Sequence, residues 1–180
     1  MITTNIGGIN VNIVIRQEKR NDFMQIYDLV KVAFQTAKVS NGKEQDFVNQ
    51  LRDSVNYIPE LALVAEENHK LIGHIMLTKN YIINSDYKTE TLLLAPISVV
   101  LEHRDKGVGS KLINTSFELA KSMGYKSVVL IGDPAYYSRF GFKRSVDLGI
   151  RYLNDIPEEY VLVCELVPSA LLEISGTFSC

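Results

Sequence analysis

The chain has 180 residues, of which 46% are hydrophobic and 22% charged, and its formal net charge is −2. This length fits one compact domain, and the nearly neutral balance argues against nucleic acid as the main partner. No apolar run approaches the roughly 20 residues that span a bilayer, so no membrane partner is expected. The only cysteines are Cys164 and Cys180, and no basic-then-apolar signal opens the chain. These features indicate a reduced, cytoplasmic setting.

The first half of the chain is predicted to hold one strand, two helices and an antiparallel meander. Residues 1–10 read as a flexible lead-in and residues 11–180 as one domain. Alternating apolar residues indicate strands, and a 3.6-residue apolar period indicates helices. In chain order, we expect a strand over 11–16, helices over 23–37 and 47–55, and strands over 61–66, 71–83 and 89–100.

Pro96 interrupts the last strand of this meander. Proline cannot donate to a ladder, so a break, a bulge or an edge is expected there. Beyond it, Ile97, Ser98 and Val99 are expected to keep backbone groups available to an extended ligand that mimics a strand. A proline that is simply tolerated on an edge strand is the alternative.

A glycine-containing turn follows, and it joins this strand to an amphipathic helix over 108–123. The turn reads Arg104-Asp105-Lys106-Gly107-Val108-Gly109. Its glycines let backbone N–H groups crowd towards one point, at the positive end of the helix dipole. Arg104 and Lys106 add positive charge. The pattern predicts a phosphate or pyrophosphate site, with an ordinary strand-to-helix loop as the alternative.

The remainder of the chain completes a βαβ unit and adds a short helix. Residues 127–131 form an apolar run typical of a buried central strand, parallel to the strand before the helix. Asp133 and Pro134 suit the start of a one- or two-turn helix over 135–140. Asp133 is predicted to cap this helix, to line a ligand groove, or both. Residues 160–167 are the best strand candidate in the tail.

This mixed α/β order resembles the GNAT superfamily of acyl-CoA-dependent N-acetyltransferases. The turn at residues 104–109 matches the signature Arg/Gln-x-x-Gly-x-Gly/Ala, and a second motif, Tyr-x-x-x-Gly-Phe, matches residues 137–142. The amino-acid sequences of residues 94–99 and 132–137 resemble those of the bacterial YhbS-like subgroup. The resemblance implies a GNAT-like fold, in which a meander precedes the βαβ unit and the central strand pair is splayed.

The resemblance also implies a function: transfer of an acetyl group from acetyl-CoA to a primary amine, by direct attack in a ternary complex. The acceptor would be a small molecule, or a protein N-terminus or lysine, and the enzyme a monomer or homodimer. Tyr137 would act as general acid on the departing thiolate. Ile97, Ser98 and Val99 would bind the pantetheine arm, and Glu44 would bind the acceptor. Asp133 and Tyr136 would line the cofactor groove. The pyrophosphate would be bound by Arg104, Asp105, Lys106, Gly107, Val108, Gly109 and Ser110.

Other chemistries fit the sequence less well. A dinucleotide fingerprint lacks its third glycine, because Leu112 stands in that place, and no Walker-type phosphate loop is present. The three histidines show no metal-ligand spacing, so no metal is expected. Glu90 lies well before Pro96 and is not expected to reach the thioester. A rival from another class is a non-catalytic acyl-CoA sensor or interaction module, which would keep the turn but not need Tyr137.

Overall fold

The computed structural model describes residues 4–6, 9–37 and 40–180 of the chain. They fall into two compact units, one comprising Met1–Met76 with Pro96–Ser116 and the other Leu77–Ala95 with Phe117–Cys180. The chain therefore passes between units inside two strands and one helix. Each unit is described by itself below.

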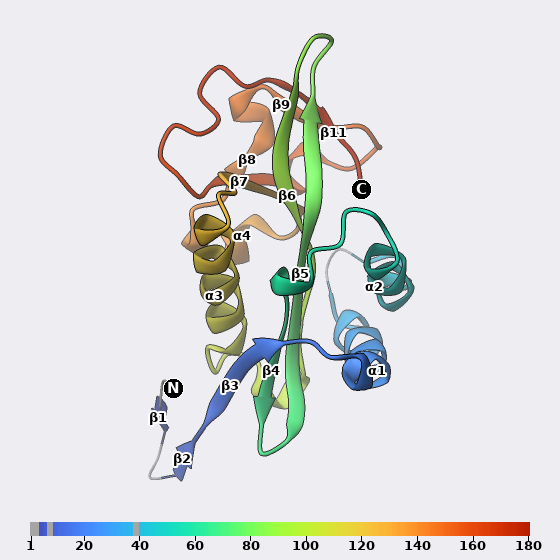
Figure 1. Cartoon of the computed structure of the whole chain (residues 1–180), viewed down its shortest axis with the longest axis vertical. Helices are drawn as coiled ribbons and strands as arrows, with labels where there is room; N and C mark the ends of the chain where they lie inside the picture. Colours follow the sequence, from blue (N-terminus) through green and yellow to red (C-terminus); the bar gives the residue numbers. More distant parts are fainter. Residues whose placement is uncertain (1–3, 7–8, 38–39) are drawn as a thin grey trace. The chain divides into compact units, whose positions relative to one another are not determined.

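The first unit carries the N-terminal elements (Figure 1). In chain order these are β1 (Thr4–Ile6), β2 (Ile9–Val11), β3 (Ile13–Gln17), α1 (Phe23–Phe34), α2 (Glu44–Arg52), β4 (Ala62–Glu67), the first part of β5 (Lys70–Ile83), the last part of β6 (Lys88–Val99) and the first turns of α3 (Val108–Ser122). Short 3₁₀ segments cover Arg20–Asp22, Pro59–Leu61 and Leu101–His103. Strand β4 pairs antiparallel with β5, as the predicted meander requires. Strand β3, which was predicted without a partner, pairs antiparallel with β4. β1 and β2 pair with each other, and all but Val11 of these two strands falls in the predicted lead-in. The strand predicted over 11–16 corresponds to β3, Ile13–Gln17.

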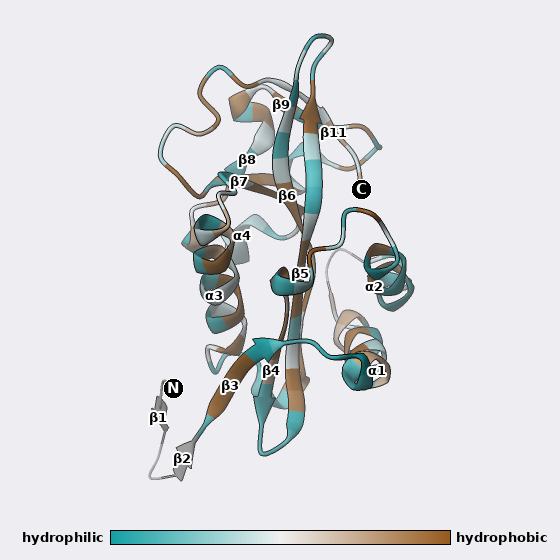
Figure 2. Ribbon diagram, viewed as in Figure 1, coloured by the Kyte–Doolittle hydropathy of each residue, from teal (hydrophilic) through white to brown (hydrophobic). Residues whose placement is uncertain are grey.

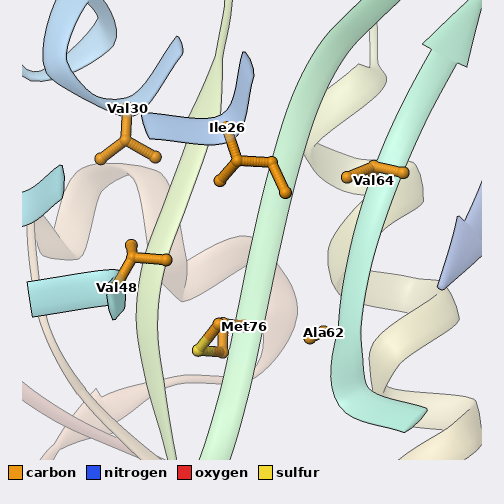
Figure 3. Packing of buried hydrophobic residues seen from close by; sticks show 6 residues of the cluster. All are labelled: Ile26, Val30, Val48, Ala62, Val64 and Met76. Carbon is orange, nitrogen blue, oxygen red and sulfur yellow. The ribbon is translucent and has the colours of Figure 1, made fainter. Parts of the chain in front are cut away.

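Helices α1 and α2 cover one face of β4 and β5 in this unit. Figure 3 shows the apolar cluster that joins them, and its members come from both helices and both strands: Ile26, Val30, Val48, Ala62, Val64 and Met76. All six side chains are buried, so their removal from water stabilises the packing of both helices. By contrast, the turn between β4 and β5 is hydrophilic in Figure 2.

The start of α3 packs on the other face of the same strands. A Cβ added at Gly73 of β5 would lie 3.0 Å from Leu112 Cδ1 and 3.2 Å from Val108 Cγ1, both on α3. It would also lie 3.2 Å from the backbone oxygen of Ser98 on β6. The absence of a side chain at Gly73 therefore lets α3 begin close to the end of β6.

The second unit holds the remainder of β5, β6 and α3 and the C-terminal elements (Figure 1). These are β7 (Ser127–Ile131), α4 (Pro134–Tyr137), β8 (Lys143–Arg144), β9 (Ile150–Tyr152), β10 (Val161–Glu165) and β11 (Gly176–Phe178), with 3₁₀ segments at Ser138–Phe140, Ser145–Leu148 and Glu158–Tyr160. The predicted strands over 127–131 and 160–167 are present as β7 and β10. The sequence did not predict β8, β9 or β11, each of which has at most three residues.

Strands β6 and β7 are parallel, which confirms the βαβ unit and the mixed α/β class. Among the described residues their ladder comprises Leu92 with Val128 and Leu93 with Val129. This ladder ends before Pro96. Strand β6 itself runs through Pro96 to Val99 without a break, so of the expected break, bulge or edge the structure shows an edge on this side of β6. On its other side β7 pairs antiparallel with β10 along its whole length. None of the helices in the described part of the chain is long and apolar enough to cross a membrane.

Candidate functional site

The predicted site residues fall in two groups, one in each unit. Ile97, Ser98, Val99 and the turn that follows belong to the first unit, together with Glu44. Asp133, Tyr136 and Tyr137 belong to the second.

The turn contains two residues with positive φ, Gly107 and Asp105. Gly107 has φ +80°, and no atom lies within 4 Å of a Cβ added there, so its backbone conformation rather than lack of space favours glycine. Asp105 also has a positive φ, of 59°, which aspartate tolerates better than most residues. Helix α3 begins at Val108, and its first i→i−4 bond runs from Lys111 N–H to Gly107 O at 3.0 Å.

The N–H groups before Lys111 therefore have no i→i−4 partner inside the helix. They belong to Val108, Gly109 and Ser110 and point out of the N-terminus of a 15-residue helix. Lys106 is exposed on the same turn. Donor groups, the helix dipole and a lysine together suit an anion with several oxygens.

The guanidinium of Arg104 is directed at α1. Its Nη2 donates to Ala33 O at 2.7 Å, its Nη1 to Thr36 Oγ1 at 2.7 Å, and its Nε to Val99 O at 3.3 Å. Arg104 was predicted as a pyrophosphate ligand. These three bonds hold its side chain against α1 and the end of β6.

The end of β6 is held in place on one side. Val100 N–H donates to Ile72 O at 3.0 Å, which ties this segment to β5. Ile97 and Val99 are half-buried and Ser98 is 5% exposed. The Ser98 hydroxyl is buried and has no hydrogen-bond partner among the described residues, although buried polar groups usually have one.

Glu44 is the first residue of α2, and its side chain bonds to the backbone just before the helix. Its Oε1 accepts from Asn41 N–H at 2.8 Å. Its Oε2 is buried and has no partner in the described part of the chain. A buried carboxylate oxygen that lacks a donor is suited to a cationic group.

In the second unit, Asp133 caps α4 as predicted. Its carboxylate accepts from Ala135 N–H at 3.0 Å, and Pro134 occupies the first helical position. Just before it, Gly132 N–H donates to Tyr160 O at 2.9 Å. The cap thus begins α4 directly where β7 ends.

Tyr137 is packed among aromatic rings and against Gly132. Its ring centroid lies 5.0 Å from that of Tyr136 and 5.7 Å from that of Phe142, both in edge-on arrangements. A Cβ at Gly132 would overlap Cε2 of Tyr137 and lie 3.0 Å from Cδ2. Burial raises the pKa of Tyr137 well above its usual value, and the neighbouring Tyr136 and Asp133 raise it further. The hydroxyl therefore carries its proton near neutral pH, as a general acid must.

Tyr136 faces a different set of groups. The Arg139 guanidinium lies 4.8 Å from its ring centroid, and Arg139 Nε donates to Tyr136 O at 2.9 Å. Phe140 packs at 5.6 Å. The two adjacent tyrosines are thus distinguished by their surroundings.

The sequence did not reveal a buried charged cluster in the first unit. Glu18 accepts from Arg52 Nε at 2.8 Å, from Arg52 Nη2 at 3.0 Å and from Tyr57 Oη at 2.8 Å, and its Oε2 lies 3.0 Å from His74 Nε2. The side chains of Glu18 and His74 are 1% and 0% exposed. His74 had been interpreted as packed or surface histidine, and it is packed. The sequence signal that could have indicated this cluster is the position of His74 in an otherwise apolar strand.

The charges in this cluster are set by burial and by the partners. Burial alone would raise the pKa of Glu18, but bonds from His74 and Arg52 outweigh it and lower the pKa to about 2. Burial lowers the pKa of His74, against the opposing effect of Glu18. Glu18 is therefore ionised and His74 neutral near pH 7.

Other candidate chemistry finds no support in the described residues. No group of three or more His, Cys, Asp or Glu side chains there is arranged to hold a metal ion. Cys164 is buried, and burial raises the pKa of its thiol to about 11, so it is a poor nucleophile. Glu90 lies on β6 in the second unit, with Lys79 Nζ 4.0 Å from its Oε1.

Comparison with known proteins gives a consistent result. A family model described as an acetyltransferase (GNAT) domain matches residues 14–145. The uncharacterized N-acetyltransferase YjhQ of Escherichia coli K12 is 34% identical over 119 residues, and the match spans 66% of this chain and 66% of YjhQ.

Two solved structures cover almost the whole chain. The E. coli YhbS structure, a complex with CoA, has a TM-score of 0.81 and 23% identity, and the match covers 97% of this chain and 93% of YhbS. A GNAT family acetyltransferase from Brucella melitensis, solved in complex with acetyl-CoA, has a TM-score of 0.75 and 28% identity, with 94% and 96% of the two chains covered.

Proposed function

Because the chain belongs to the GNAT acetyltransferase family, we propose that it transfers an acetyl group from acetyl-CoA to a primary amine. The observation that carries this proposal is the turn at residues 104–109, where a glycine with φ +80° precedes the N-terminus of α3. The acetyl-CoA bound to the Brucella relative supports the choice of ligand. The acceptor is proposed to be a small molecule, or the N-terminus or a lysine of a protein.

The cofactor is proposed to lie along the end of β6 and over the turn. Backbone groups of Ile97 and Val99 would pair with the two pantetheine amides, next to Ser98. The N–H groups of Val108, Gly109 and Ser110 would hold the diphosphate, together with Lys106 and the backbone of Arg104, Asp105 and Gly107. Asp133 and Tyr136 are proposed as further cofactor-binding residues.

In the reaction, the amine nitrogen attacks the thioester carbonyl carbon. A backbone N–H on this strand, at Val99 or its neighbour, would stabilise the negative charge on the oxygen. When the carbon–sulfur bond breaks, the Tyr137 hydroxyl would give its proton to the sulfur, consistent with its raised pKa. The amine would lose its own proton to a base acting through water. The half-buried Glu44 carboxylate, with one oxygen lacking a donor among the described residues, is proposed to bind the cationic acceptor.

The first test is whether acetyl-CoA binds. A ligand that binds only the native state raises the melting temperature, by an amount that grows with its concentration. Acetyl-CoA at 100 times its Kd stabilises the native protein by about 2.7 kcal/mol. An unchanged melting temperature over a millimolar titration of acetyl-CoA would rule out the proposed cofactor site.

The second test identifies the acceptor. Amines, polyamines, amino acids and N-terminal peptides are screened for release of coenzyme A, detected as free thiol. Thiol release that depends on one acceptor class assigns the substrate. Binding of acetyl-CoA without release on any amine would instead favour a non-catalytic acyl-CoA sensor.

A further inference from the structure

The side chain of Arg104 joins the turn to the end of α1. This arginine opens the turn, yet two of its nitrogens bond to Ala33 O and Thr36 Oγ1, both at 2.7 Å. Its Nε also donates to Val99 O at 3.3 Å. One guanidinium therefore contacts the end of β6 and the end of α1, all inside the first unit.

One of the groups that accept these bonds, Ala33 O, is a carbonyl at the C-terminus of α1. The helix ends at Phe34, and Ala37 N–H bonds to Phe34 O at 3.2 Å instead of to Ala33 O. The Thr36 hydroxyl lies 3.4 Å from Ala33 O. Arginine satisfies these last groups and places positive charge at the negative end of the helix dipole.

The planar guanidinium is well suited to this task. Its N–H groups form a rigid fork, whereas the lysine ammonium is a single point charge. To reach a phosphate, Arg104 would have to give up two bonds of 2.7 Å. Lys106, two residues further on and exposed, offers charge to an anion without that loss.

The chain that leaves α1 leads to the proposed acceptor residue. Asn41 N–H donates to Glu44 Oε1 at 2.8 Å, which fixes the segment before α2. The end of α1 is thus connected to the turn by Arg104, and Glu44 begins the next helix in the sequence, α2.

We propose that Arg104 is a positioning residue that couples the cofactor-binding turn to the C-terminal end of α1, rather than a ligand of the diphosphate. This inference rests on the proposed function. When CoA fixes the turn, Arg104 holds residues 33–36 in place, and the same coupling makes an ordered α1 terminus favour CoA binding.

The test combines amide hydrogen exchange at residues 35–37 with CoA titration, for wild type and for Arg104→Lys, Arg104→Met and Lys106→Met. Both Arg104 variants are expected to speed exchange at residues 35–37 by about tenfold in the free protein, the factor that corresponds to about 1.4 kcal/mol. Lysine is expected to fail like methionine, because it cannot supply the fork. Saturating CoA slows this exchange in wild type but not in either Arg104 variant.

Affinity for CoA separates positioning from phosphate binding. With Arg104 replaced, the Kd for CoA is expected to stay within about threefold of wild type. The rise of this Kd with salt concentration is expected to be unchanged, because Arg104 is not one of the cationic groups that contact the phosphates. Lys106→Met is the matched control. It should weaken CoA binding most at low salt and leave exchange at residues 35–37 unaltered.

Two results would overturn the inference while leaving the proposed function intact. One is that Arg104→Met weakens CoA binding as much as Lys106→Met, with the same loss of salt dependence, while Arg104→Lys binds normally. The other is that CoA still slows exchange at residues 35–37 in the Arg104 variants. If wild type itself binds no CoA, both the proposed function and the coupling are wrong.

Discussion

Hydrogen bonds between polar groups surround the turn at residues 104–109, whereas aromatic rings surround Tyr137. In the first unit, Arg104 binds the end of α1, and His103 Nε2 lies 2.9 Å from Glu67 Oε2. In the second unit, Phe142 packs on Tyr137 at 5.7 Å and on Phe117 at 5.9 Å. The difference suits the proposed tasks, because the turn would bind charge through its backbone while Tyr137 would act through one hydroxyl.

The turn and the Tyr137 region should therefore respond to different perturbations. Backbone N–H donors remain when side chains change, so the turn is expected to be sensitive to backbone conformation and to charge. The Tyr137 region is proposed to act through one hydroxyl, so it should lose its function when that group is removed. The following experiments test this division, from the largest expected effect to the smallest.

Removing the Tyr137 hydroxyl is expected to have the largest effect. Tyr137→Phe keeps the ring packing and removes the proton donor, so turnover should fall by roughly 10²–10⁴-fold while the Kd for CoA changes little. Steady-state kinetics with an acceptor found by thiol release provides the measurement. Tyr136→Phe is the matched control and should keep most of the turnover. Full activity in Tyr137→Phe would end the general-acid assignment.

Acid is expected to weaken the unit that carries the turn. The pKa of Glu18 is about 2 in the folded protein against 4.5 in the reference state. Since one pKa unit corresponds to about 1.4 kcal/mol, ionised Glu18 contributes about 3 kcal/mol to stability. This contribution is complete above pH 4.5 and is lost as the pH falls towards 2. Because the pKa of His74 is lowered, some stability is already lost below about pH 6.5.

Urea unfolding between pH 7 and pH 3 measures this loss. The Glu90→Gln variant is the control, since Glu90 is half-exposed and Lys79 Nζ lies 4.0 Å from its Oε1, a contact worth little at an exposed site. Its pH profile should match that of wild type. A free energy of unfolding that stays level down to pH 3 would contradict the role assigned to Glu18.

A methyl group at Gly132 is expected to disturb the packing of Tyr137 and to leave the turn at residues 104–109 unchanged. The added Cβ would overlap the Tyr137 ring, and overpacking of this kind costs about 1–3 kcal/mol. A double-mutant cycle provides the control, because Tyr137→Ala removes the ring that clashes. Gly132→Ala should therefore destabilise wild type more than it destabilises Tyr137→Ala. Equal effects in both backgrounds would show that the ring contact is unimportant.

The smallest expected effect is that of Gly107→Ala on the turn. With open space around it but φ at +80°, alanine there meets only backbone strain, which costs about 1–2 kcal/mol. Gly124 has φ +90° and equally open surroundings, so Gly124→Ala should lose similar stability. Only Gly107→Ala should also weaken CoA binding, measured by calorimetry. If both variants bind CoA like wild type, the conformation of the turn does not matter for the ligand.

Long periodic segments were predicted well from the sequence, and short irregular ones were not. The apolar period over α3 and the compact run of β7 gave boundaries within one residue of the structure. The helices predicted over 23–37 and 47–55 cover Phe23–Phe34 and Glu44–Arg52 instead, so their type was predicted correctly but not their ends. Strands β8 and β9, of two and three residues, are defined by their partners and carry too few residues for a period.

The same limit applies to side-chain partners. His74 and Glu18 are separated by 56 positions in the chain, and no local pattern connects them. For Arg104 the sequence indicated charge beside the glycines, but its partners Ala33 and Thr36 lie 71 and 68 positions away.

The sequence by itself determined the family, the βαβ unit, the glycine turn and the capped start of α4. All of these depend on neighbours in the chain, where spacing and backbone preference act directly. Tertiary structure alone decided that Glu18 is buried with His74, that the Tyr137 ring covers Gly132, and that Arg104 turns from the glycines to α1. Such contacts depend on which distant segments pack together, because burial and hydrogen-bond geometry are set by packing rather than by sequence spacing.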